Sequence, residues 1–172
     1  MYFIFSYLIG CVMFGYWVMR LVYREDIRSV GSGNVGARNG GRLRGASAFA
    51  AIFLGDALKG ASVILLGRYL NYAEPLLLLG LGFAIIGHIK PITLKFKGDK
   101  GVSTFIGGML ALEPWLAFVI IISFLVLYPF TKSFTLSGLG AFLATPATIM
   151  IKSGNWLSCV ISLSLCCFGK IA

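Results

Sequence analysis

The sequence predicts an all-α fold: a polytopic transmembrane bundle of about seven helices, in a single domain over residues 1–172. The first observation is composition, because 58% of the residues are hydrophobic, only 12% are charged, and the mean hydropathy is +0.90. Soluble domains carry about 25% charged residues. The second observation is that basic residues gather in two segments between apolar runs, as in cytoplasmic loops. The net charge of +9 therefore indicates membrane topology, and we expect the lipid bilayer and no nucleic acid as a partner.

Apolar runs divide the chain into the expected helices, because about 20 residues cross a hydrocarbon core about 30 Å thick. The run Val102–Leu112 is short, so it either crosses the membrane or forms a re-entrant segment. Counted as a crossing, it completes a set of seven helices. These are Tyr2–Met19, Gly45–Tyr69, Leu76–Ile89, Val102–Leu112, Trp115–Phe130, Thr135–Ile151 and Trp156–Phe168.

The two basic segments, Arg20–Arg44 and Lys90–Lys100, set the expected orientation. By the positive-inside rule both face the cytoplasm, which places the N-terminus outside and, with seven crossings, the C-terminus inside. No basic residue precedes Tyr2–Met19 and no small-residue cleavage site follows it, so we do not expect a signal peptide.

The stretch Ser29–Arg44 has the composition of a phosphate-binding loop, rich in glycine and arginine and without a carboxylate. Glycine lets a ligand approach backbone N–H groups closely, and successive N–H groups in turns form anion-binding concavities. Arginine presents a rigid fork of donors that fits phosphate oxygens. The candidate ligands are Gly31, Ser32, Gly33, Asn34, Gly36, Asn39 and Arg42.

Two other interpretations apply to this stretch. Its first three glycines also spell the G-x-G-x-x-G turn of dinucleotide-binding folds, but that turn must follow a buried strand. The preceding residues, Arg24–Arg28, read R-E-D-I-R, which argues against such a strand. A flexible arginine-rich loop without a ligand stays open as the alternative.

Asp56 and Lys59 lie inside the run Gly45–Tyr69. A charge at the centre of a membrane helix costs roughly 2.5–3.5 kcal/mol on insertion scales. Three positions apart on a helix, the two residues share a face and can neutralise each other. They either mark a functional site in the bundle interior, or they form a structural pair near the interface with Lys59 reaching the headgroups.

A second glycine- and lysine-rich turn opens the helix expected at Val102–Leu112. A helix N-terminus with free N–H groups is a ready anion site. The spacing is not that of a Walker A loop, which has four residues between its first glycine and the Gly-Lys pair. Two such loops on one membrane face predict either two phosphate groups or one phosphate held from two sides. The candidate ligands here are Gly98, Lys100, Gly101 and Thr104.

His88, the only histidine, lies where an apolar run meets the second turn. It is either a hydrogen-bonded structural residue or a proton-transfer group. The four cysteines lie in apolar runs without metal-ligand spacing, and we expect them to be small apolar residues of the bundle. The sequence therefore predicts no metal site and no cofactor.

Together these residues resemble the motifs of the bacterial acyl-phosphate:glycerol-3-phosphate acyltransferase family. The family's G-S-G-N-x-G-A-T-N-x-x-R is matched by Gly31–Arg42, with Arg38 in the threonine position. Three further motifs, D-x-x-K-G, G-H-x-x-P and F-x-G-G-K-G-V-A-T, are matched by Asp56–Gly60, Gly87–Pro91 and Phe96–Thr104. In the last of these, Asp99 replaces a glycine and Ser103 an alanine. A T-R-Y-x-S-L-S-like motif is matched loosely by Thr131, Lys132, Thr135, Leu136 and Ser137.

The resemblance implies a seven-helix enzyme of the bacterial cytoplasmic membrane that performs the first step of phospholipid synthesis. It would transfer a fatty acyl group from acyl phosphate to the 1-hydroxyl of glycerol 3-phosphate, giving lysophosphatidate and phosphate. His88 would be the base, unless an oxygen of the substrate phosphate takes the proton. The implied catalytic residues are Ser32, Arg42, His88 and Lys100, with Asp56, Lys59, Thr135 and Ser137 in support.

Asp99 stands beside Lys100, and we expect its carboxylate to point to solvent or to cap the helix that begins near Val102. Members of the family continue past the last span with a basic tail, and this sequence ends at Gly169–Ala172 without one. Two alternatives therefore accompany the enzyme. One is a small membrane transporter or binding protein for an organic phosphate, and the other is an inactive homologue that lacks the C-terminal motif.

Overall fold

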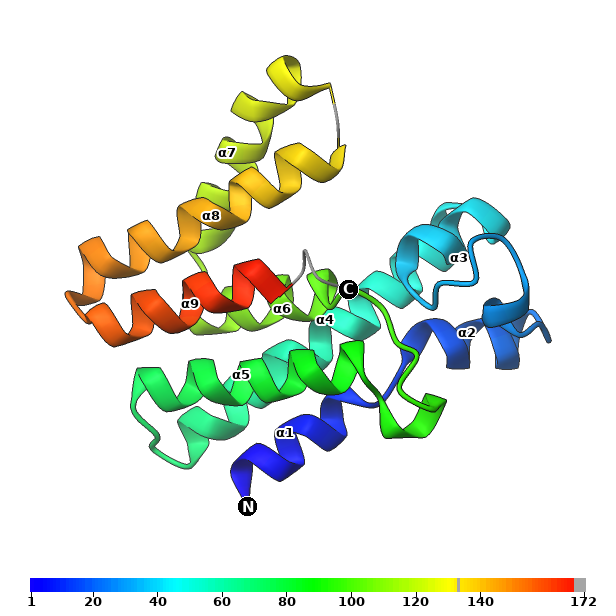
Figure 1. Cartoon of the computed structure of the whole chain (residues 1–172), viewed down its shortest axis with the longest axis horizontal. Helices are drawn as coiled ribbons and strands as arrows, with labels where there is room; N and C mark the ends of the chain where they lie inside the picture. The colour runs from blue at the N-terminus through cyan, green and yellow to red at the C-terminus, as the bar shows by residue number, and fades with distance from the viewer. Residues whose placement is uncertain (133, 169–172) are drawn as a thin grey trace.

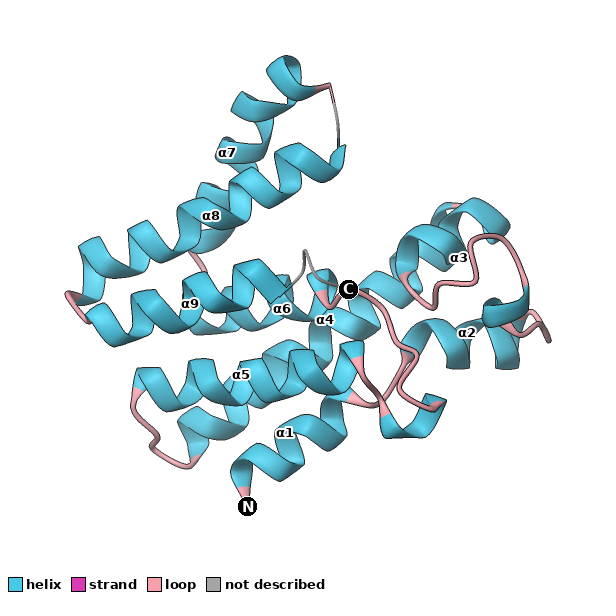
Figure 2. Ribbon diagram, viewed as in Figure 1, coloured by secondary structure: helices cyan, strands magenta, loops and turns pink. Residues whose placement is uncertain are grey.

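The computed structural model describes residues 1–132 and 134–168, with the side chains of 117, 134, 135, 139, 142, 153 and 166–168 left out. This part of the chain contains α-helices, two short 3₁₀ turns and no strand, which confirms the all-α prediction (Figures 1 and 2). The elements are α1 (Tyr2–Gly10), α2 (Phe14–Val22), η1 (Ile27–Ser29), α3 (Ala37–Arg44), α4 (Ala46–Tyr69), α5 (Glu74–Ile89), η2 (Ile92–Leu94), α6 (Val102–Leu112), α7 (Leu116–Thr131), α8 (Phe134–Ser153) and α9 (Trp156–Phe168).

Helix α4 runs through the middle of the bundle and packs against α3, α5 and α6. Glycines set how closely these helices approach. A Cβ on Gly60 of α4 would overlap the carbonyl of Thr104, and a Cβ on Gly107 of α6 would overlap the carbonyl of Ala57. Membrane helices associate through small residues of this kind, because no hydrophobic force drives them together in lipid. The position of α6 against α4 therefore follows from glycine contacts.

The bundle keeps apolar side chains on its outside as well as in its core. Large apolar residues of α7 such as Phe118, Ile122 and Leu125 are more than half exposed, while Asp56 and His88 are about 1% exposed. So many large apolar side chains on the outer surface are unusual in a soluble protein and suit a lipid environment. Among the described residues, two stretches are long and apolar enough to cross a membrane, α4 and residues 74–94, and the bent pair α1–α2 would be a third.

The run Tyr2–Met19, predicted as one membrane-spanning helix, is divided into two helices, α1 and α2. The chain breaks after Gly10, and α1 and α2 meet at an angle of 41°. A break inside lipid leaves carbonyls without helical partners, which is unfavourable unless other donors reach them. Here Lys59 Nζ donates to Gly10 O (3.0 Å) and Val12 O (2.6 Å), and Thr93 Oγ1 donates to Cys11 O (2.8 Å). Side chains from α4 and η2 therefore stabilise the bend.

The first basic segment is also less loop-like than expected. Residues Ala37–Arg44 form α3, so Gly40 and Gly41 are helical and do not belong to a glycine-rich turn. The other predicted runs are confirmed to within three residues, and α6 and α9 begin and end at the predicted residues. With 11 residues, α6 extends about 16 Å at 1.5 Å per residue, about half of a hydrocarbon core.

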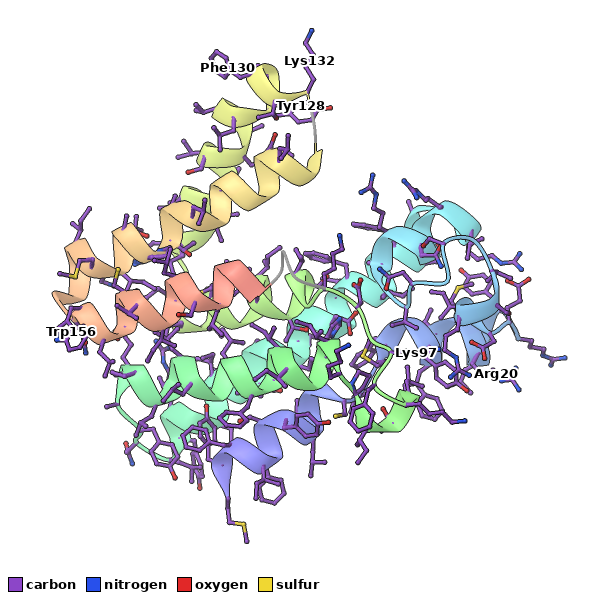
Figure 3. All side chains as sticks on the ribbon, viewed as in Figure 1. Arg20, Lys97, Tyr128, Phe130, Lys132 and Trp156 are labelled. Atoms are coloured by element: carbon purple, nitrogen blue, oxygen red, sulfur yellow. The ribbon has the colours of Figure 1, made fainter. Side chains whose placement is uncertain are left out.

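Both basic segments lie at one end of the bundle (Figure 1). Figure 3 shows Arg20 and Lys97 at this end, whereas Trp156 lies at the opposite end. At that opposite end Glu113 holds α6 and α8 together, since its carboxylate pairs with Lys152 and accepts a hydrogen bond from Trp115 Nε1 (2.9 Å). The two basic segments and the Glu113–Lys152 ion pair therefore lie at opposite ends of the bundle.

Candidate functional site

The first loop, residues 30–36, joins η1 to α3 and is shaped by glycine. Gly31 and Gly33 have φ angles of +61° and +72°, a region that side-chain-bearing residues rarely adopt. Gly36 has an ordinary φ of −87°, but it is the N-cap of α3 and is buried. The turn therefore requires glycine at positions 31 and 33. Position 36 also requires glycine, because a Cβ there would overlap the carboxylate of Asp99.

Asn39 of α3 organises this loop from inside. It is 3% exposed, and its Oδ1 accepts a hydrogen bond from the backbone N–H of Ser32 (3.0 Å). Its Nδ2 donates to the carbonyls of Asn34 (2.9 Å) and Val30 (3.2 Å). The amide that the sequence suggested as a phosphate ligand is thus used within the loop.

The arginines of the first basic segment divide into paired and available ones. Arg28 pairs with Asp26 and lies 5.0 Å from the ring centre of Tyr16, and Arg44 pairs with Glu25. The hydrogen bonds from Arg28 lower the pKa of Asp26 to about 2. Arg42 is exposed and forms no ion pair within the described part of the chain. Its guanidinium is therefore available to a ligand, as is the exposed Ser32.

The second loop, residues 90–101, folds back over the end of α5. The N–H of Gly98 donates to Ile89 O (3.2 Å) and the N–H of Asp99 to His88 O (3.3 Å). A Cβ on Gly98 would overlap that same His88 carbonyl, so only glycine fits. Gly101, with a φ of +75°, is the N-cap of α6, and Lys100 is exposed. The predicted helix start at this turn is confirmed.

His88 lies at the centre of the site and is 1% exposed. Its Nδ1 is 3.2 Å from Thr104 Oγ1 and 3.8 Å from Asp56 Oδ1. Its Nε2 is buried and makes no hydrogen bond to any described residue, and the carboxylate of Asp99 is 3.8 Å away. Nδ1 is thus held by the bundle, whereas Nε2 faces the loops without a partner. Thr104, predicted as a phosphate ligand, is fully buried beside the imidazole and is not exposed at the surface of the second loop.

The pairing of Asp56 with Lys59 is confirmed. Lys59 Nζ lies 3.1 Å from Asp56 Oδ1, and the two side chains are 3% and 1% exposed. The alternative of an interfacial pair with a snorkelling lysine is wrong, because the ammonium points to the break between α1 and α2. Asp56 is therefore linked to Lys59 on one side and faces His88 on the other.

The expectation that Asp99 points to solvent is wrong. Its side chain is 19% exposed, and a Cβ on Gly36 would overlap its Oδ2. Burial acts to raise the pKa of Asp99, but its interactions with His88, the N–H of Lys100 and the side chain of Asn34 outweigh this and hold the pKa below its usual range. The carboxylate turns inward because Gly36 leaves room for it and these polar groups receive it.

Asp99 is the site residue that the sequence did not assign. One signal was available, since it is the only acidic residue between Glu74 and Glu113 and it lies inside a basic glycine turn. Ser137 is placed elsewhere: its buried Oγ lies 2.6 Å from Thr131 Oγ1. The side chain of Thr135 is outside the described residues.

The fold and the site define a class: a helical integral membrane protein with two basic, glycine-shaped loops closed over a buried histidine. Residues 1–170 match the family model described as glycerol-3-phosphate acyltransferase. The chain belongs to the glycerol-3-phosphate acyltransferase family, and it is an integral membrane acyltransferase of phospholipid synthesis.

Relatives support this over most of the chain. It is 42% identical to glycerol-3-phosphate acyltransferase 1 of Bacillus cereus over 162 residues, covering 94% of this chain and 89% of that protein. It is 40% identical to glycerol-3-phosphate acyltransferase 1 of Desulfitobacterium hafniense over 148 residues, 86% and 73% of the two chains. The crystal structure of PlsY (YgiH), an integral membrane glycerol 3-phosphate acyltransferase in its glycerol 3-phosphate form, matches with a TM-score of 0.88 and 26% identity, over 99% of this chain and 85% of that one.

Proposed function

We propose that this acyltransferase moves a fatty acyl group from acyl phosphate to the 1-hydroxyl of glycerol 3-phosphate, giving lysophosphatidate and phosphate. The observation that carries the proposal is the meeting of two basic, glycine-shaped loops over the unpartnered Nε2 of His88. Both substrates bear a phosphate, and each loop has groups suited to one. The solved structure of PlsY in its glycerol 3-phosphate form supports the choice of acceptor.

The reaction needs the hydroxyl proton to be removed as the hydroxyl oxygen attacks the acyl carbon. In the proposed sequence His88 Nε2 takes this proton, the tetrahedral intermediate collapses, and the bond between the acyl carbon and the phosphate oxygen breaks. Acyl phosphate has a good leaving group, so the remaining requirements are positioning and charge stabilisation. Arg42 and Lys100, both exposed at the loops, would hold the phosphates and the developing negative charge.

The test is release of inorganic phosphate by the purified protein in detergent. With acyl phosphate as donor, release is expected only when glycerol 3-phosphate is present, and lysophosphatidate should form in equal amount. Acyl groups offered as thioesters of acyl-carrier protein or of coenzyme A should give no product. Product formation from either thioester, with none from acyl phosphate, would contradict the proposed donor, and transport without product would favour a carrier of organic phosphate.

Replacing Ser32 or Arg42 with alanine should lower kcat/KM for glycerol 3-phosphate. A charge-assisted hydrogen bond contributes roughly 1.5–3 kcal/mol, so kcat/KM of Ser32→Ala or Arg42→Ala should fall on the order of tenfold or more. Arg44→Ala is the matched control, because Arg44 is already paired with Glu25. The measurement is the steady-state rate against glycerol 3-phosphate concentration for folded protein. Unchanged kinetics in both site variants would make the first loop structural.

We also propose that the basic end of the bundle faces the cytoplasm of a bacterial cell. The support is the gathering of Arg20–Arg44 and Lys90–Lys100 at this end, as the positive-inside rule describes. Single cysteines replacing Ser29 and Lys97, both exposed, should resist an impermeant thiol reagent added to intact cells of a cysteine-free variant. They should react once the cells are opened. Labelling of either position from outside would reverse the orientation.

A further inference from the structure

The carboxylate of Asp99 lies beside His88, the proposed base, and beside two residues that the sequence suggested as phosphate ligands, Asn34 and Gly36. Its pKa is lowered in part by the Asn34 side chain, it fills the space beside Gly36, and it is 3.8 Å from His88 Nε2. These groups come from both loops and from the end of α5. The only acid of the second loop therefore reaches across to the first loop.

The space around this carboxylate suits an anion at the N-terminus of α3 and a hydrogen-bond donor beside His88 and Asn34. Gly36 is the N-cap of α3, and negative charge is favoured at a helix N-terminus. Two polar atoms beside it are buried without a hydrogen-bond partner among the described residues: His88 Nε2 and Asn34 Oδ1. His88 is 1% exposed, and its unpartnered nitrogen is aimed into this space. A hydroxyl of a bound molecule could donate a hydrogen bond to one of these two atoms. The Asp99 carboxylate cannot do so, and it therefore leaves them without a partner.

We propose that Asp99 sets the affinity of the enzyme for glycerol 3-phosphate, because its carboxylate occupies part of the phosphate position and is displaced when the substrate binds. The inference rests on the proposed function and names a determinant of affinity within that site. Two anions cannot share Asn34 and the N-terminus of α3 without strong repulsion, so the carboxylate has to leave when the phosphate arrives.

Displacement does not require the second loop to unfold. The loop is fixed by backbone hydrogen bonds from Gly98 and Asp99 to the end of α5, and by Thr93 to Cys11 O. None of these uses the Asp99 carboxylate. Rotation about the side-chain bonds of Asp99 can therefore clear the site while its backbone stays in place. The lowered pKa of Asp99 keeps it charged at neutral pH, so competition is present under ordinary conditions.

The test is direct binding of glycerol 3-phosphate, measured by calorimetry on purified protein in detergent without an acyl donor. Asp99→Asn keeps the shape of the side chain and removes its charge. We expect its Kd to be about tenfold lower than that of the wild type at low salt, with the gap narrowing as salt rises because charge repulsion is screened. KM for glycerol 3-phosphate should fall in parallel. Asp99→Ser should bind more tightly as well, which keeps the test open if the asparagine variant folds poorly.

Two controls separate competition from a general charge effect. Asp99→Glu keeps the charge and should bind no more tightly than the wild type. Asp26→Asn makes the same charge change near the first loop, but Asp26 is paired with Arg28 and does not lie on the site, so its Kd should change little.

Weaker or unchanged binding in both Asp99→Asn and Asp99→Ser would overturn the inference and make the carboxylate a clamp between the loops. That result leaves the proposed function intact as long as the wild type binds glycerol 3-phosphate and forms lysophosphatidate. A wild type that neither binds nor acylates glycerol 3-phosphate would overturn both.

Discussion

Lys59→Met should lower the free energy of unfolding by about 3–5 kcal/mol, the range for removing one partner of a buried ion pair. Lys59 is 4% exposed. Its ammonium forms an ion pair with Asp56 and donates hydrogen bonds to the carbonyls of Gly10 and Val12. Methionine fills a similar volume but donates no hydrogen bond. The variant leaves a buried carboxylate uncompensated and the two carbonyls at the helix break without a donor. Unfolding in detergent, followed by denaturant titration or by heating, measures the loss.

Two companion variants make this result specific. Lys97→Met removes an exposed lysine of the second loop and should change stability by no more than about 0.5 kcal/mol. The double variant Asp56→Asn/Lys59→Met should be more stable than Lys59→Met alone, because the buried charge is then removed. If Lys59→Met unfolds like the wild type, the ammonium does not hold the bend between α1 and α2.

His88→Asn should lower kcat by about 10²–10⁴-fold, the usual contribution of a general base. The asparagine amide can keep a hydrogen bond with Thr104 Oγ1 on the Nδ1 side, but it places no base where Nε2 lies. KM for glycerol 3-phosphate should change much less than kcat, since the phosphate ligands remain. Steady-state rates of lysophosphatidate formation, together with an unfolding curve that shows intact folding, check this prediction.

Thr104→Val provides the matched comparison for the histidine. It removes the hydroxyl beside Nδ1 while keeping shape and imidazole, so the loss of kcat should be smaller than in His88→Asn. A kcat for His88→Asn within a few-fold of the wild type would contradict the role of the base. The proton would then pass to an oxygen of the substrate phosphate.

Much of the fold was predictable because its signals are local. Hydrophobic runs bounded by proline, glycine and charged residues gave both ends of α6 and α9. The pairing of Asp56 with Lys59 followed from helix geometry alone, since residues three apart share a face. The positive φ angles at Gly31, Gly33 and Gly101 agree with the glycine turns that were predicted.

The sequence by itself therefore determined most of the helices, the two basic segments and the family motifs, all of which depend on residues close together in the chain, but not α3 inside the first basic segment. Only the tertiary structure decided the break after Gly10, the partners of His88 and the inward direction of Asp99. Lys59 reaches Gly10 and Val12 across 49 and 47 positions. Such contacts depend on how α1, α4 and α5 pack and on how the second loop folds over them. An apolar run looks the same whether or not a distant lysine caps a break within it, and so the hydrophobic pattern of Tyr2–Met19 carried no sign of the bend.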